Sequence, residues 1–123
     1  MKLEKIKENY VNWLADQLKF NQWSDSVLQV ENELVDAYGR KPFVLVEETA
    51  DGYVVTDDGF LMYKYNPIGE NEDLNEYLAG MVIDAGFDFD EEHGVISRKS
   101  SEENLPAVIT GLIQLEIMVS FIA

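Results

Sequence analysis

Apolar residues near the start of the chain recur at steps of three and four, which is the spacing of one face of an α-helix. The residues that form this stripe are Leu3, Ile6, Tyr10, Trp13, Leu14 and Leu18. Charged and amide side chains, among them Lys5, Glu8 and Asp16, fall on the other faces. The pattern predicts an amphipathic helix over residues 3–19, followed by a loop over residues 21–26.

The next part of the chain changes to a period of two, which is typical of half-buried strands. Residues 27–34 alternate between apolar and polar positions, and residues 43–49 and 53–56 are rich in Val, Phe, Tyr and Thr. Asp51 and Gly52 stand between the last two runs, and Asp-Gly between β-rich segments favours a tight hairpin turn. We therefore expect three antiparallel strands that end at a second turn, Asp57-Asp58-Gly59.

The second half of the chain returns to a helical period and then alternates once more. Residues 60–65 are compatible with a short helix or a strand, whereas an apolar stripe over residues 74–85 predicts a helix with Gly86 as its C-terminal cap. Residues 87–90 and 95–99 alternate and predict a second small hairpin. Residues from Leu105 onward are apolar on most sides, which indicates a helix that is either central in the fold or shared with a partner subunit.

Helices and strands that follow one another in this order predict an α+β fold and one domain over residues 1–123. We expect an antiparallel sheet of about five strands, packed by the N-terminal helix, a middle helix and the apolar C-terminal helix. The composition of that last helix makes a homodimer, or packing against a second domain, plausible.

Composition sets limits on location. The chain has 123 residues, of which 46% are hydrophobic, and it contains no cysteine. It therefore has no disulfide or thiolate chemistry. Its first residues lack the apolar run of a signal peptide, and Gln114 and Glu116 interrupt the apolar stretch near the C-terminus. We expect a cytoplasmic protein whose last helix is buried and does not span a membrane.

The charge distribution restricts the class of partner. The net charge is −15, from 24 acidic and 9 basic residues, and no Lys or Arg lies between Lys64 and Arg98. Because nucleic acids and anionic lipids are bound by clustered cations, we expect neither as a direct partner. The interval has nine acidic residues, of which the predicted partner-binding set is Glu70, Glu72, Asp73, Glu76, Asp88, Asp90, Glu91 and Glu92. Three roles are open for these carboxylates: they keep the domain soluble and do nothing more, they attract a basic protein, or they imitate the phosphates of a duplex.

Candidate catalytic chemistry is sparse. Asp57 and Asp58, with Asp51 and Asp36, could hold a divalent cation, although Asp and Gly are also the residues that tight turns require. The only histidine, His93, follows two glutamates in a segment that reads as an exposed hairpin tip. No serine lies in a Gly-x-Ser-x-Gly elbow and no glycine-rich phosphate loop is present. We assign no catalytic residue, cofactor or metal, and keep Asp57 and Asp58 as weak metal candidates.

Three segments together resemble a bacterial and phage-borne family known as domain of unknown function 1828. They are Tyr10-Val-Asn-Trp-Leu14, Asp51-Gly-Tyr-Val-Val-Thr-Asp-Asp-Gly-Phe60 and Gly111-Leu-Ile-Gln114. The resemblance implies the same lineage and fold over most of the chain, but no established activity. The family carries a Thr-Pro-Phe-Leu-Asp-Arg-His-Asn-Asp-like stretch where this chain has residues 30–40. Only Asp36 and Arg40 could be its remnants, so any activity of that stretch is expected to be absent here.

These observations predict a non-catalytic, acidic domain that acts by binding another macromolecule. Two alternatives remain at this stage. One is an acidic inhibitor of phage or mobile-element origin that mimics nucleic acid, and the other is a divalent-metal-dependent hydrolase.

Overall fold

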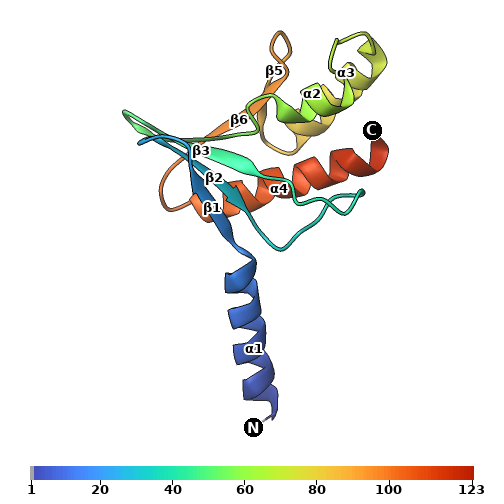
Figure 1. Cartoon of the computed structure of the whole chain (residues 1–123). Helices are drawn as coiled ribbons and strands as arrows, with labels where there is room; N and C mark the ends of the chain where they lie inside the picture. The colour runs from blue at the N-terminus through green and yellow to red at the C-terminus, as the bar shows by residue number, and fades with distance from the viewer. Residues whose placement is uncertain (1) are drawn as a thin grey trace.

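The computed structural model describes residues 2–123 and confirms the α+β class (Figure 1). Six antiparallel strands form one sheet in the order β1-β2-β3-β4-β6-β5. The elements, in chain order, are α1 (Lys2–Gln17), β1 (Lys19–Gln22), β2 (Val27–Glu31), β3 (Val44–Thr49), β4 (Gly52–Thr56), α2 (Phe60–Tyr65), α3 (Glu72–Asp84), β5 (Asp88–Asp90), β6 (Val95–Ser100) and α4 (Leu105–Ile122).

The predicted hairpins form in the expected places. β3 and β4 pair around a turn at Ala50 and Asp51, one residue before the predicted Asp51-Gly52 turn, with Thr49 opposite Gly52 and Val46 opposite Val55. β5 and β6 form the second hairpin, and β6 then pairs with β4. The segment from α2 to β5 therefore leaves the sheet after β4 and returns to it beside the same strand, which places α2, α3 and the β5–β6 turn at one end of the molecule (Figure 1).

The core lies between the sheet and α4. Val44 and Val55 from the sheet, together with Leu112, Ile113 and Val119 from α4, are completely buried. Helix α3 adds Leu78 and Val82 to the same cluster. Aliphatic side chains of this size each stabilise a fold by about 1.5–3 kcal/mol when they are buried, so this cluster is the main source of stability.

Helix α4 is long and apolar enough to cross a membrane by length and composition, with a mean hydropathy of 1.9. In the structure it packs against β3, β4 and β6, and seven of its residues are buried. Packing in the core accounts for part of its composition, as expected for a buried helix, whereas Met118, Phe121 and Ile122 are 56%, 71% and 48% exposed. The expected homodimer through this helix stays a prediction.

The structure differs from the sequence expectation in the first thirty residues. The chain leaves α1 at Gln17 and forms a sixth strand, β1, which pairs with β2 over residues where a helix end and a loop were expected. All four residues of β1 are exposed, so the strand has no apolar alternation that could have revealed it. Strand β2 ends at Glu31, three residues before the predicted end.

Helix α1 forms where its stripe predicted a helix, but the sheet does not cover it. None of its residues is buried, and Figure 1 shows it extending away from the sheet. The expectation that the N-terminal helix packs on the sheet is therefore wrong for the single chain. The apolar stripe of α1 faces solvent.

Candidate functional site

The turn after β4 is built around the carboxylate of Asp57. Its Oδ1 accepts hydrogen bonds from the backbone N–H of Gly59 at 3.0 Å and of Ile96 at 2.9 Å, and its Oδ2 accepts one from Leu61 N at 3.1 Å. Thr56 Oγ1 donates to the carbonyl oxygen of Ile96 at 2.7 Å. These bonds tie the start of α2 to β6, and they explain why the ambiguous segment over residues 60–65 is helical.

Asp57 is therefore a structural residue in this geometry. Its side chain is only 1% exposed, and burial raises its pKa although the backbone N–H groups oppose that shift. Asp58 is exposed and has a left-handed backbone with φ of 55°. Over residues 2–123, no group of three or more His, Cys, Asp or Glu side chains is placed to hold a metal ion. The metal hypothesis for Asp57 and Asp58 gains no support.

The β5–β6 turn is organised by a second aspartate. Asp90 Oδ1 accepts hydrogen bonds from the backbone N–H of Glu92 and His93, and its Oδ2 lies 2.8 Å from His93 Nδ1. The hydrogen bond to His93 is the main reason why the pKa of Asp90 lies below its ordinary value. Both side chains are exposed, as expected for a hairpin tip.

A groove of about 640 Å³ lies between α2, the loop that follows it and this turn. We call it the α2–hairpin groove. Its apolar lining includes Phe60, Met62, Tyr63 and Ile68, and Tyr63 and Ile68 are 73% and 74% exposed. Its acidic lining residues are Asp58, Glu91 and Glu92, and the only other titratable side chains in the lining are Tyr63 and His93. The groove thus combines exposed apolar surface with negative charge.

The groove depends on a close approach at Gly94, which has φ of 66°. A Cβ atom at this position would lie 2.9 Å from Cβ of Met62, well inside van der Waals contact. We expect Gly94→Ala to destabilise the fold by about 1–3 kcal/mol, because both the left-handed backbone and the contact with α2 oppose a side chain. Urea unfolding measures this effect. Gly69→Ala, where φ is 69° and no heavy atom lies within 4 Å of the added Cβ, isolates the cost of the backbone alone.

All eight predicted partner-binding acids are exposed, and they lie on neighbouring elements. Glu72, Asp73 and Glu76 are in the first turns of α3, after Glu70 in the preceding loop. Asn75 of α3 lines the same groove as Glu91 and Glu92, so α3 and the β5–β6 turn border one surface. Asp88 and Asp90 lie on β5, with Asp90 committed to the turn.

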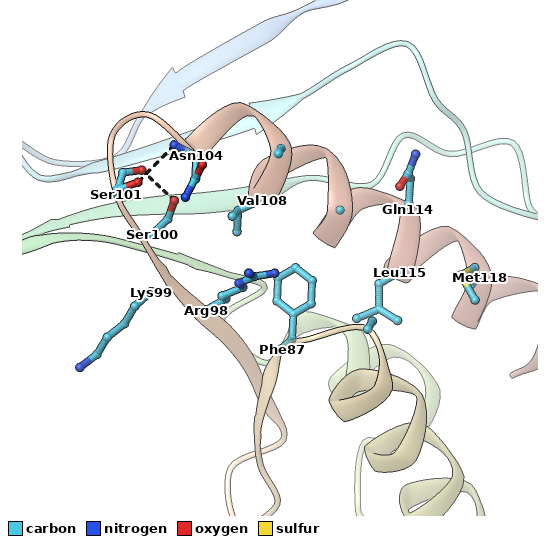
Figure 2. Close-up of a pocket in the computed structure, with 13 residues that line it drawn as sticks. Phe87, Arg98, Lys99, Ser100, Ser101, Asn104, Val108, Gln114, Leu115 and Met118 are labelled. Atoms are coloured by element: carbon cyan, nitrogen blue, oxygen red, sulfur yellow. Dashed lines mark hydrogen bonds between the residues drawn. The ribbon is translucent and has the colours of Figure 1, made fainter.

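A second cavity, of about 600 Å³, has the opposite charge (Figure 2). It lies between the end of β6 and α4, and its lining includes Arg98 and Lys99 but no carboxylate. The guanidinium of Arg98 lies 5.9 Å from the ring centre of Phe87, and Figure 2 shows both side chains directed toward α4. Two of the chain's nine basic residues are thus kept away from the acidic groove.

Asp36 and Arg40, the two possible remnants of the family motif, form a local structure. Asp36 Oδ1 accepts hydrogen bonds from the backbone N–H of Tyr38 and Arg40, and Oδ2 lies 3.6 Å from Arg40 Nε. Burial alone would raise the pKa of Asp36, but the two backbone N–H groups and the Arg40 guanidinium hold it below its ordinary value. Asp36 therefore organises its own loop and is not brought to the groove.

Sequence reasoning found the acids of this surface but missed its apolar part. Tyr63 and Ile68 belong to a segment whose secondary structure was ambiguous, and nothing in their spacing connects them to Glu91 and Glu92. The one sequence feature that pointed to this surface was the absence of Lys and Arg between Lys64 and Arg98, which marks the interval as negatively charged.

No family model, curated protein or solved structure matches this chain. The resemblance to domain of unknown function 1828 therefore stays a prediction.

Proposed function

We propose that this chain is a non-catalytic domain that binds a basic segment of another protein in the α2–hairpin groove. The observation that supports this proposal is the groove itself, in which exposed Tyr63 and Ile68 lie beside Asp58, Glu91 and Glu92. Exposed apolar and aromatic surface supplies binding energy, and a rim of one charge selects the partner.

The surrounding charge favours the same partner. The first turns of α3 add exposed Glu72, Asp73 and Glu76 to this end of the molecule. Carboxylates of one sign raise the local concentration of cationic segments and speed their association.

A peptide of alternating lysine and leucine tests the proposal when it is titrated into isotopically labelled protein and followed by NMR. We expect chemical-shift changes centred on Tyr63, Ile68 and Gly94. Binding should weaken at least about tenfold in the triple variant Asp58→Asn, Glu91→Gln, Glu92→Gln, because about 1.4 kcal/mol of lost attraction is enough for that change. It should also weaken between about 50 mM and about 300 mM salt, because exposed charges are screened.

A peptide of alternating glutamate and leucine is the matched probe, and Glu102→Gln, Glu103→Gln is the matched variant because both positions are exposed and outside the groove. Equal binding of the two peptides, or shifts spread over the whole sheet, would contradict the proposal.

A narrower form of this function is inhibition of a nucleic-acid enzyme by mimicry of its substrate. It is favoured by the eight exposed acids on α3, the loop before it, β5 and the β5–β6 turn, and by the absence of Lys and Arg between Lys64 and Arg98. Displacement of duplex DNA from a basic DNA-binding protein by this chain, and not by the triple variant, would distinguish mimicry from binding of a basic peptide.

A further inference from the structure

Helix α1 has an apolar face that no other part of the described chain covers. Leu3, Ile6 and Tyr10 are 68%, 61% and 61% exposed, and Tyr10 stacks on Trp13 with ring centres 6.3 Å apart. The succession Leu3, Ile6, Tyr10, Trp13, Gln17 alternates steps of three and four, which is the seam of a coiled coil. A lone helix of this length is only marginally stable in water, so a covering partner would stabilise it.

We infer that α1 pairs with α1 of a second copy of this chain, antiparallel, to form a homodimer. The seam formed by Leu3, Ile6, Tyr10 and Trp13 would be buried between the two helices. This interface is separate from the α2–hairpin groove and from α4, so it does not depend on the proposed function.

The charge distribution of the chain favours a second copy of the same chain as the partner that covers α1. Residues 1–20 carry four lysines against three acids, a net charge of +1, whereas residues 21–123 carry 21 acids against five basic residues, a net charge of −16. Lys2, Lys5 and Lys7 lie at the free end of α1, far along the helix from its own sheet. An antiparallel pair brings these lysines toward the acidic body of the other copy.

The same charges decide the orientation of the pair. A parallel arrangement would place two bodies of net charge −16 side by side. An antiparallel arrangement separates the bodies by the length of a 16-residue helix, about 24 Å. Since the Debye length is about 8–10 Å at ordinary salt, the repulsion between the bodies is then largely screened.

The area is sufficient for a modest affinity. Tyr10 and Trp13 are 61% and 49% exposed, so each has roughly half of the 150–250 Å² of an aromatic side chain left to bury. With Leu3 and Ile6, the two aliphatic residues of the seam, they bring each chain to somewhat under about 600 Å², the lower end of stable interfaces. We therefore expect association in the micromolar range.

Analytical ultracentrifugation between about 5 and about 500 µM tests the inference. The wild-type chain should approach twice its monomer mass of 14.0 kDa as the concentration rises. Ile6→Gln, Tyr10→Gln should weaken dimerisation at least about tenfold without changing the unfolding of the body, because neither residue is buried. Val11→Gln is the matched control, since Val11 is 62% exposed but lies off the seam. A wild-type monomer at the highest concentration, or equal weakening by Val11→Gln, would overturn the inference.

Cross-linking through introduced cysteines tests the orientation of the two helices. Only the introduced cysteine can react, because the chain has no native cysteine. A bismaleimide that spans about 10 Å should join two copies of Tyr10→Cys near the centre of the helix. It should not join two copies of Leu3→Cys, which lie more than about 15 Å apart along an antiparallel pair. Asn12→Cys, on the opposite face, should also remain unlinked. Efficient linkage through Leu3→Cys would contradict the antiparallel arrangement.

Discussion

Asp57→Ala is expected to lower the free energy of unfolding by about 3–5 kcal/mol, the largest effect of any single substitution proposed for this chain. The substitution removes the acceptor for three backbone N–H groups, those of Gly59, Leu61 and Ile96. Each buried donor without a partner costs about 1–3 kcal/mol. Small domains have a stability of only about 5–15 kcal/mol, so the variant will be close to unfolding. Urea denaturation followed by circular dichroism measures the change.

The free energy of unfolding of Asp57→Asn should lie between those of the wild type and of Asp57→Ala. It removes the cost of burying a charge, but it turns one acceptor into a donor that faces a backbone N–H. Asp58→Asn is the matched control because Asp58 is exposed and Asn tolerates its left-handed backbone, so its effect should stay within about 0.5 kcal/mol. If Asp57→Ala were as mild as Asp58→Asn, the turn would not depend on the buried carboxylate.

Glu116→Gln is expected to stabilise the protein by about 1 kcal/mol or more at pH 8, because the amide cannot ionise and so avoids the cost of burying a negative charge. Glu116 lies on α4, is 6% exposed, and lines a cavity of about 140 Å³ with Lys64 and Tyr65. Burial, and secondarily the negative charge of Asp57, raise its pKa well above the ordinary value of 4.5, while Lys64 opposes the shift.

The sign of the pH dependence follows from this shift. In the folded chain the raised pKa keeps Glu116 protonated over a pH range in which the unfolded chain has already lost that proton. Its contribution to stability is therefore complete below about pH 4.5 and is lost as the pH rises through the folded pKa. Consequently Glu116→Gln should have little effect on stability at pH 4 and a larger stabilising effect at pH 8.

Thermal unfolding between pH 4 and pH 8 measures the difference between the variant and the wild type. Glu103→Gln removes one negative charge at an exposed position and controls for the general repulsion of this acidic chain. Glu116→Met, which fills the same space without a polar group, should stabilise at pH 8 as well. A constant difference between Glu116→Gln and the wild type at all pH values would show that ionisation of Glu116 is not the cause.

Periodicity predicted the elements whose side chains alternate between core and solvent. The valines of β3 and β4, the Asp51-Gly52 turn and the stripe of α3 led to the right elements, because burial on one face imposes a period on the sequence. Residues 19–22 gave no such signal because all four are exposed, and their strand exists only through pairing with β2.

The sequence by itself determined the α+β class, the acidity that disfavours nucleic acid as a partner, and the separation of acids from basic residues between Lys64 and Arg98. Only the tertiary structure decided which of those residues meet. Tyr63 and Ile68 lie beside Glu91 and Glu92 in the folded chain. The buried carboxylate of Asp57 accepts a hydrogen bond from β6, and the apolar stripe of α1 is left uncovered. The physical reason is that composition and period are local properties of the chain. Contact between α2 and a turn thirty residues later depends on how β6 returns to β4, and no local pattern encodes that return.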